Sequence, residues 1–427
     1  MILPDWTQRV FNLIVAVHVL AYVSFVQAVL VVVGGRKVYL IDVVFAFFAV
    51  SVLVALAGTK PGDAWGRQHS IKVLALFAGW GLIELARGIP RFGLSAVGES
   101  RYLVLPALFY FFVLAAYRDR TALQKFVTIA VTLVCVMPLV RGFLFYFRGG
   151  RASLVDQFAG SEVLSAQAGF RFILAGEAVL VASVAVGLLM FVAGQDAAKR
   201  RGALLLLATS LFVVLAVVQV RAAWVTSAVG IAVGSALVAR FFRYAALSVG
   251  VAAGVLALAG PVASMLGTDA GTRSGVHASL AYSATFLRDP SADVTAAWRL
   301  TLWRQALASA SDHPLVGQGI GGYWKNVGPN GLPANQTPHN GYLAVLVKLG
   351  GIGLALLLAG VSLWCLELMR FIRREPDPHF RLLAKAVAVT VVMSATFAFF
   401  YDFTIAFWVA LAAGTVLVRS QSPAVTV

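Results

Sequence analysis

The stretch QTPHNGYLAVLVKLGGIG (336–353) joins the longest polar part of the chain to a long apolar run. Apolar runs of similar length recur along all 427 residues, which are 60% hydrophobic and 12% charged. A bilayer offers no water to backbone polar groups, so such runs form helices. Strict alternation of apolar and polar residues is absent, which argues against an outer-membrane barrel. The composition therefore predicts an all-α polytopic integral membrane protein and excludes an ordinary soluble domain.

Hydropathy over a window of about twenty residues predicts about twelve membrane helices. The predicted spans are 10–33, 38–58, 71–89, 102–117, 125–147, 171–194, 202–220, 222–242, 244–266, 340–368, 382–400 and 403–419. The first run follows Arg9 and lacks a small-residue cleavage site, which predicts a retained helix. We therefore divide the chain into nine transmembrane helices (1–266), a long polar loop (267–338), three further transmembrane helices (339–419) and a tail (420–427).

Lysine and arginine predict the orientation of these helices, because basic residues accumulate in cytoplasmic loops. Alternate short connections of the twelve-helix arrangement carry dense basic clusters, which places them and both termini in the cytoplasm. These clusters are Lys60, Arg67 and Lys72; Arg118, Arg120 and Lys125; Lys199, Arg200 and Arg201; Arg240 and Arg243; and Arg370, Arg373, Arg374, Arg381 and Lys385.

The opposite, exoplasmic side also carries many arginines, and the net charge of the chain is +16. Two interpretations are open: either part of the topology is wrong and these arginines meet lipid phosphates, or they form a site for a phosphorylated substrate. Arginine suits the second interpretation because its planar fork binds phosphate oxygens in pairs. The exoplasmic arginines are Arg87, Arg91, Arg101, Arg148, Arg151, Arg171, Arg221, Arg273, Arg288, Arg299 and Arg304.

The polar loop is long enough to indicate a functional element rather than a simple connection. Within it, VTAAWRLTLWRQALASAS (294–311) predicts a helix on which Arg299 and Trp303 share a face. GQGIGG (317–322) resembles a phosphate-binding loop but lacks a surrounding βαβ unit, so we interpret it as a flexible turn. Glu84 and Glu177 lie in apolar runs, and we expect each to pair with a nearby arginine such as Arg87 or Arg171.

His339 lies where the polar loop meets the apolar run. Thr337 is a candidate helix cap and Pro338 suits the first helical position, which predicts His339 in the first turn. The positive end of the helix dipole would lower the pKa of the histidine and keep its ring neutral. A neutral imidazole accepts a proton, as a general base must. The alternative is a histidine that only hydrogen-bonds at a helix end. The six histidines show no metal-ligand spacing, so we expect neither a metal nor a cofactor.

Three segments together resemble the O-antigen ligase and polymerase superfamily. PHNGYLAVLVKLGGIG (338–353) is similar to the Pro-His-Asn-x-Tyr-Leu segment that follows a long periplasmic loop in those proteins. WRLTLWRQALASASDHPLVGQGIGGY (298–323) resembles their Arg-x-x-x-Trp helix and Pro-Leu-x-Gly-x-Gly turn. VRAAW (220–224) resembles their Ser-Arg-x-x-Trp segment, except that Val220 replaces the serine.

The resemblance implies a metal-independent, inverting glycosyltransferase of GT-C-like architecture in the bacterial inner membrane, with a periplasmic active site. The donor would be a glycan on undecaprenyl pyrophosphate, and the acceptor a sugar hydroxyl of lipid A-core. Membrane lipids would be the other partners, and nucleic acid none. The resemblance assigns His339 as the general base and Arg221 and Arg299 as pyrophosphate-binding residues. Residues of the same segments given supporting roles are Asn340, Trp303, Arg304 and Tyr342.

Other functions stay open at the level of sequence. The single dominant exoplasmic loop and basic exoplasmic face favour a ligase over a polymerase. A protein O-oligosaccharyltransferase usually has a larger periplasmic part at its C-terminal end. A flippase or other transporter of lipid-linked glycans would also have many helices and arginines. Transporters often show internal repeats or paired broken helices, and neither is found in the sequence.

Overall fold

The structure is a computed structural model that describes residues 29–33, 36–39, 68–117, 120–147, 175–194, 198–218, 220–265, 294–322, 326–327, 333–334 and 338–420. Among these residues, five helices are long and apolar enough to cross a membrane. They are His69–Phe92, Arg120–Val140, Ala175–Gly194, Gly341–Arg374 and Pro378–Phe397. The fold is thus confirmed as that of a helical, multi-pass membrane protein. The count of about twelve spans, the GT-C-like architecture and the domain division stay predictions.

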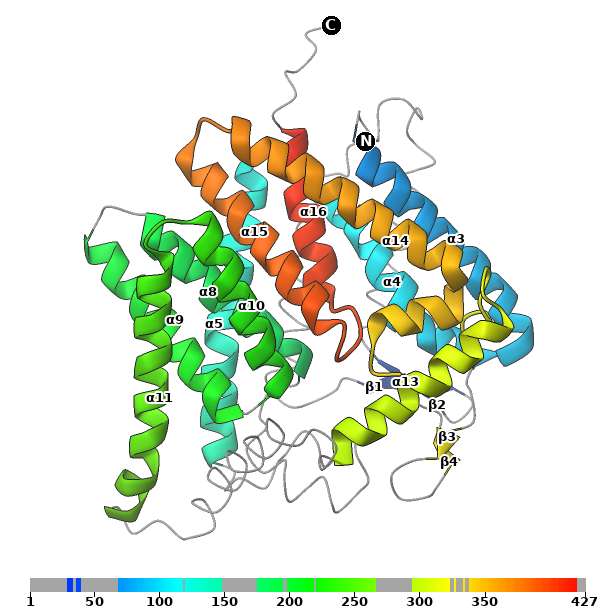
Figure 1. Cartoon of the computed structure of the whole chain (residues 1–427), viewed down its shortest axis with the longest axis horizontal. Coiled ribbons are helices and arrows are strands. Elements are labelled where there is room, and N and C mark those ends of the chain that lie inside the picture. The colour runs from blue at the N-terminus through cyan, green and yellow to red at the C-terminus, as the bar shows by residue number, and fades with distance from the viewer. Residues whose placement is uncertain are drawn as a thin grey trace, which may run out of the picture.

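The first half of the bundle is built from α3 (His69–Phe92), α4 (Leu94–Ala116), α14 (Gly341–Arg374) and α16 (Ile405–Arg419). Figure 1 shows α14 lying beside α3 although some 250 residues separate them, and α16 packs against α4. Buried aromatic side chains fill this core, with Phe77 stacked on Trp408 at 5.9 Å between ring centroids. The indole of Trp364 donates to the Leu411 carbonyl, which ties α14 to α16.

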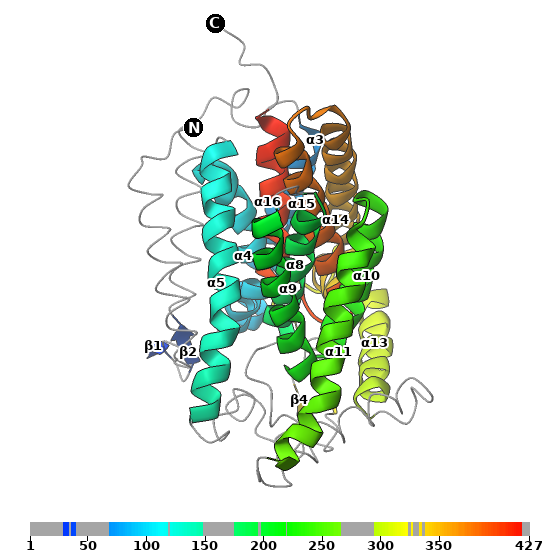
Figure 2. The same ribbon diagram turned by 90° about the vertical axis from the view of Figure 1, so that its left-hand side faces the viewer.

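The second half contains α8 (Ala175–Gly194), α9 (Ala198–Val218), α10 (Arg221–Leu237) and α11 (Phe241–Met265). Figure 2 shows these helices together with α5 (Arg120–Phe147), which contacts α8. Helix α15 (Pro378–Phe397) lies between the two halves and contacts helices of both. One face of α15 buries Val387 and Val391 in the first core, and another buries Val389 and Met393 in the second. Helix α15 therefore joins the two cores into one bundle.

Two predicted helices are wrong in part. Val29–Val33 (β1) and Arg36–Tyr39 (β2) form an antiparallel hairpin, where helices over 10–33 and 38–58 were expected to end and begin. The remainder of both spans lies outside the described residues. The sequence of β1 is VLVVV, and branched side chains favour the extended backbone over a helix. Gly34 and Gly35 follow it, and a pair of glycines between two such runs is a hairpin signal.

Most other helix boundaries differ from the predicted ones by a few residues, but α4 begins eight residues earlier than expected. Only Gly93, with a φ of 58°, separates α3 from α4. Hydropathy missed this start because ESR (99–101) is polar, although Glu99 is buried inside the bundle. Residues 94–101 are therefore the first turns of a helix rather than an exoplasmic connection.

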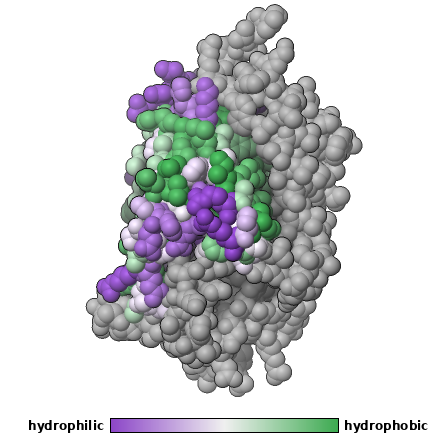
Figure 3. Space-filling view, turned by 90° about the vertical axis from the view of Figure 1, so that its right-hand side faces the viewer, coloured by the Kyte–Doolittle hydropathy of each residue, from purple (hydrophilic) through white to green (hydrophobic). Residues whose placement is uncertain are grey.

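The face that carries α3 and α14 has the polarity expected of a membrane protein. Figure 3 shows an apolar belt bounded by polar surface on this side of the molecule. Large apolar side chains of α3 and α14 are exposed among the described residues, including Leu76, Ile83, Leu358 and Leu366. A belt of this kind is what lipid tails contact, and a soluble monomer rarely exposes so large an apolar patch.

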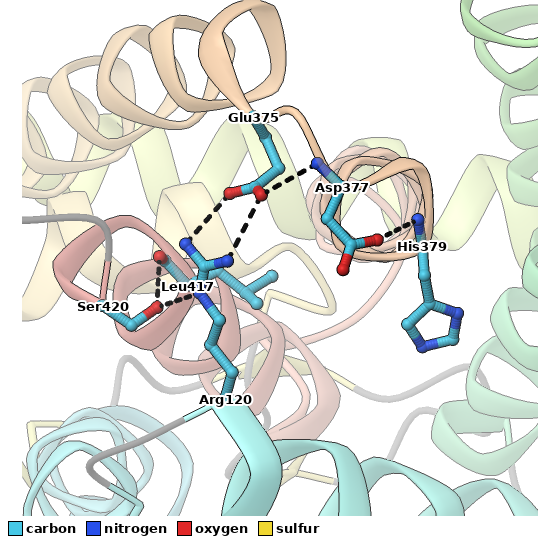
Figure 4. A network of polar contacts seen from close by, with 6 residues as sticks. All are labelled: Arg120, Glu375, Asp377, His379, Leu417 and Ser420. Carbon is cyan, nitrogen blue, oxygen red and sulfur yellow. Dashed lines mark hydrogen bonds and ion pairs between the residues drawn. The ribbon is translucent and has the colours of Figure 1, made fainter.

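Basic residues from predicted cytoplasmic clusters meet at one end of the bundle. Arg120 lines a hollow together with Arg374 and Ser420, and its guanidinium pairs with the buried carboxylate of Glu375 at 2.9 Å. Figure 4 shows this network, in which Arg120 also donates to Ser420 at 2.7 Å. The clusters around Arg120 and Arg374 thus share one end, as the topology predicts; which side of the membrane this end faces stays a prediction.

Candidate active site

His339 does not lie in the first turn of a helix, as the sequence predicted. Helix α14 begins at Gly341, and its N-cap is Asn340, whose side chain accepts from the Leu343 N–H at 3.1 Å. His339 precedes this cap with a φ of 46°, a left-handed conformation that a histidine rarely adopts. Asn340 can cap the helix because its side-chain oxygen accepts a hydrogen bond from a free N–H of the first turn. The predicted cap, Thr337, lies outside the described residues.

The start of α14 rests on the turn between α15 and α16. The Gly341 N–H lies 2.7 Å from the carbonyl oxygens of both Ala398 and Tyr401. A Cβ at Gly341 would approach the Phe403 ring to 2.9 Å, so a larger residue would push the turn away. Tyr342 donates to the Ala395 carbonyl at 3.0 Å. Tyr342 therefore holds the start of α14 against α15 rather than facing His339.

Helix α13 (Val294–Asp312) supplies the other wall of the site. The indole of Trp303 donates to the Pro338 carbonyl at 2.9 Å, directly before His339. The ring centroids of Trp298 and His339 are 5.5 Å apart. The ring of Tyr401 meets the His339 ring edge to face, with 6.1 Å between centroids. The imidazole is therefore held between aromatic rings from α13 and from the α15–α16 turn.

Arg299 reaches the same group of rings. Its guanidinium carbon lies 4.9 Å from the centre of the Tyr401 ring, a cation–π contact. Among the described residues, the buried Nε of Arg299 and the indole nitrogen of Trp298 have no hydrogen-bond partner. Buried donors are nearly always paired, so these two would be available to acceptor atoms of a ligand.

The surroundings of His339 keep its ring neutral. Burial lowers the pKa of His339 to about 4, and the nearby positive charge of Arg299 acts in the same direction. The direction agrees with the sequence-based expectation, but the cause differs, because His339 lies outside the helix whose dipole was invoked. A neutral ring at ordinary pH is able to accept a proton.

Arg221 is the first residue of α10 and lies at the same end of the bundle. Helices α10 and α15 are antiparallel: Lys385 donates to the Leu237 carbonyl at 2.7 Å, and a Cβ at Gly230 would meet the Met393 side chain. Arg221 lies nine residues before Gly230, or about 13 Å along the helix. That direction leads toward the end of α15 at which Tyr401 lies. The structure therefore brings Arg221, Arg299 and His339 to one end.

Arg304 has an exposed side chain on α13. Glu84 pairs with Arg87 at 2.6 Å, as predicted, while Glu177 belongs to the first turn of α8 and Arg171 lies outside the described residues. No group of three or more histidine, cysteine or acidic side chains with metal-binding geometry occurs in the described part of the chain.

Trp298, Tyr401 and its neighbour Asp402 were not predicted among the site residues. Tyr401 and Asp402 form the polar break between two apolar runs, and that break was the available signal. Burial raises the pKa of the Asp402 carboxyl, with the charge of Lys348 opposing that rise. Trp298 directly precedes Arg299, but nothing in the sequence around its aromatic ring indicated a place in the site.

The arrangement is a basic and aromatic group of side chains at one end of a helical membrane bundle. Residues 203–358 match the family model described as O-Antigen ligase, and this range includes Arg221, Arg299 and His339. The match confirms the resemblance to the O-antigen ligase and polymerase superfamily, whose members are glycosyltransferase-like enzymes. A comparison with curated proteins finds no match to the chain.

Proposed function

We propose that the chain is an inner-membrane glycosyltransferase that transfers O-antigen glycan from undecaprenyl pyrophosphate to a sugar hydroxyl of lipid A-core at the periplasmic face. The observation that carries the proposal is the pairing of a neutral, half-buried His339 with Arg299 around Tyr401. Such a pair combines a proton acceptor with a cation that binds phosphate oxygens. The match over residues 203–358 supports the same class of reaction.

In the proposed reaction, the acceptor hydroxyl oxygen attacks the anomeric carbon of the glycan, and its proton passes to His339. The bond between that carbon and the pyrophosphate oxygen breaks, and the electron pair leaves with undecaprenyl pyrophosphate. Arg221 and Arg299 stabilise the negative charge that develops on the leaving group. Attack opposite the leaving group inverts the anomeric centre.

The donor itself would prepare the base. The positive charge of Arg299 contributes to the low pKa of His339 in the empty site. A pyrophosphate bound to Arg299 brings negative charge close to the imidazole, which raises the pKa toward the ordinary value. A histidine with a higher pKa is a stronger proton acceptor, so binding the donor would strengthen the base that the next step needs.

The test is an assay of purified protein with lipid-linked donor and acceptor, in the absence of ATP and of an ion gradient. Transfer to lipid A-core is the expected result, whereas transport without transfer would contradict the proposal. A second glycan repeat and an acceptor protein, offered separately, report a polymerase or a protein O-oligosaccharyltransferase instead. The proposed mechanism needs no metal, so excess EDTA should leave the rate unchanged.

A further inference from the structure

Helix α14 is broken at Gly350, and the segment that follows α13 fills the break. Gly350 has a φ of 68° and a ψ of −173°, outside the helical region. An unbroken helix would join the N–H of Gly351 to the carbonyl of Val347. That N–H instead donates to Pro314 at 2.7 Å, and the Val347 carbonyl accepts from the Gln318 N–H at 2.8 Å.

The same exchange repeats one residue along. The Ile352 N–H donates to the Leu315 carbonyl at 3.2 Å, and the Lys348 carbonyl accepts from the Gly319 N–H, also at 3.2 Å. The third carbonyl, that of Leu349, accepts from the indole of Trp80 on α3 at 2.9 Å. Residues 313–322, which we call the insert segment, therefore replace part of the hydrogen-bond ladder of α14. The turn that the sequence predicted over residues 317–322 is present, and its backbone is bound to α14 by these hydrogen bonds.

The insert segment also touches the helices beneath it. A Cβ at Gly88 on α3 would collide with the Ile320 carbonyl, so the segment approaches the α3 backbone directly. Gly321, with a φ of 96°, lies against Ala96 on α4, where a Cβ would come within 2.7 Å of backbone atoms. Glycines at these places allow a close approach that any side chain would prevent.

A buried ion pair completes the assembly. The Lys348 ammonium pairs with Oε2 of Glu99 on α4, and the same oxygen accepts from the Gly321 N–H at 3.1 Å. The exposed fractions of the two side chains are 7% and 4%. Glu99 thus holds two elements at once: the insert segment through Gly321, and the first part of α14 (residues 341–349) through Lys348.

Those two elements carry the candidate active site. The insert segment continues directly from α13, which bears Arg299 and Trp298. The first part of α14 begins directly after His339. Ala306 and Ala310 of α13 pack on Val347, so α13 and the first part of α14 form one unit. A movement of this unit on α4 would change how the Tyr401 ring of the α15–α16 turn lies against His339.

We propose that Glu99 and Lys348 are positioning residues for glycan transfer, which fix His339 and Arg299 relative to the α15–α16 turn without touching the substrate. This inference rests on the proposed function for its rate measurements, but the position of His339 is measurable without transfer. Displacing a reacting group by about 1 Å costs roughly 100-fold in rate. We therefore expect a rate loss of about 10- to 100-fold from breaking the pair.

The experiment compares Glu99→Gln, Lys348→Met and the double variant with wild type in full-length protein. Each single variant leaves a buried group without its partner and should lower the melting temperature. The double variant removes both charges and should regain much of that stability. A positioning role predicts that the double variant still transfers slowly. Recovery of both stability and rate would overturn the proposal, because the pair would then serve the fold alone.

A second readout follows His339 itself. Diethyl pyrocarbonate modifies neutral imidazole, and peptide mapping across pH gives the apparent pKa of His339 in each variant. Loosened enclosure should raise that pKa from about 4 toward 6.5 in the double variant. The matched control is Glu375→Gln, which breaks another buried ion pair of the bundle, with Arg120, and should leave the His339 titration unchanged. An unchanged titration in the double variant would contradict the proposal.

The two readouts separate the failure of the inference from that of the proposed function. A wild-type protein that transfers no glycan would overturn the proposed function, while the His339 titration would still decide whether Glu99 and Lys348 position the site. Normal transfer by wild type, with no loss in the double variant, would overturn the positioning inference alone.

Discussion

The two ends of α14 each carry a buried ion pair, but they differ in how many polar atoms are satisfied. At the far end, both carboxylate oxygens of Glu375 bind Arg120, and Oε1 also accepts from the Asp377 N–H at 3.2 Å (Figure 4). The guanidinium of Arg120 also lies over the rings of Phe371 and Phe380. Arg120, Glu375 and Ser420 are thus joined by hydrogen bonds and an ion pair within the protein, as a structural clamp requires.

At the His339 end, several buried polar atoms have no hydrogen-bond partner among the described residues. These are Oε1 of Glu99, Nε of Arg299 and the indole nitrogen of Trp298. The end also contains the left-handed backbone of His339 and the helix break at Gly350. Unsatisfied polar atoms and unusual backbone conformations concentrate at functional sites, where a ligand supplies the missing partners. From this comparison we expect changes at the Glu375 end to affect stability and changes at the His339 end to affect transfer.

The largest effect that would test this assignment is expected from His339→Ala. Loss of a general base typically costs about 100- to 10,000-fold in rate. The donor should still bind, because the arginines hold its pyrophosphate. Single-turnover transfer and donor binding measure the two effects separately. A variant that loses donor affinity in proportion to rate would show that His339 serves binding instead.

Arg299→Ala should reduce transfer by roughly 100- to 1,000-fold, as does removal of one group that stabilises developing negative charge. Unlike His339→Ala, it should also weaken donor binding. Arg299→Lys should recover only part of the activity, since lysine keeps the charge and loses the planar fork. Arg304→Ala is the matched control, because Arg304 lies on the same helix with an exposed side chain. Equal loss in both arginine variants would argue for a general charge effect.

Glu375→Gln should affect stability without affecting chemistry. Breaking a buried ion pair leaves a charge unpaired and costs about 3–5 kcal/mol of folding free energy. We expect a lower melting temperature and an unchanged transfer rate per folded molecule. If the transfer rate falls in Glu375→Gln while the protein remains folded, the claim that this end serves only stability is contradicted.

Trp303→Phe should have the smallest effect of the series. It removes the hydrogen bond to the Pro338 carbonyl and keeps most of the ring packing. A neutral hydrogen bond contributes about 1 kcal/mol, which corresponds to a several-fold change in rate if the bond positions His339. Kinetics measured at saturating donor would detect that change, and a wild-type rate would show that Trp303 only packs.

The sequence predicted most helices of the described chain, because long apolar runs have few alternatives in a bilayer. It missed the Val29–Tyr39 hairpin and the break at Gly350, since the apolar pattern continues through both. A Gly-Gly pair follows β1 and another occurs at Gly350 and Gly351, but glycine also serves helix packing in membranes.

For the site, the motif segments predicted His339, Arg221 and Arg299 at one end of the bundle. Tyr401, which contacts His339 and Arg299, lies in a turn some 60 residues after His339, and only the polar break in the sequence there pointed to it. The left-handed backbone conformation of His339 could not be predicted from the sequence either. Thr337 and Pro338 suggested an earlier helix start, and only the contacts of Gly341 with the α15–α16 turn fix where α14 begins.

The most direct test of the account is the pH dependence of single-turnover transfer by wild-type protein, measured at low and at saturating donor together with donor affinity. At low donor, the rate reports the free protein and should fall as pH drops through about 4, where His339 takes up a proton. At saturating donor, the same fall should occur at higher pH, because the bound pyrophosphate opposes the charge of Arg299. A rate that does not fall on acidification, or one that falls only because donor affinity is lost, would contradict the assignment of His339 as the base.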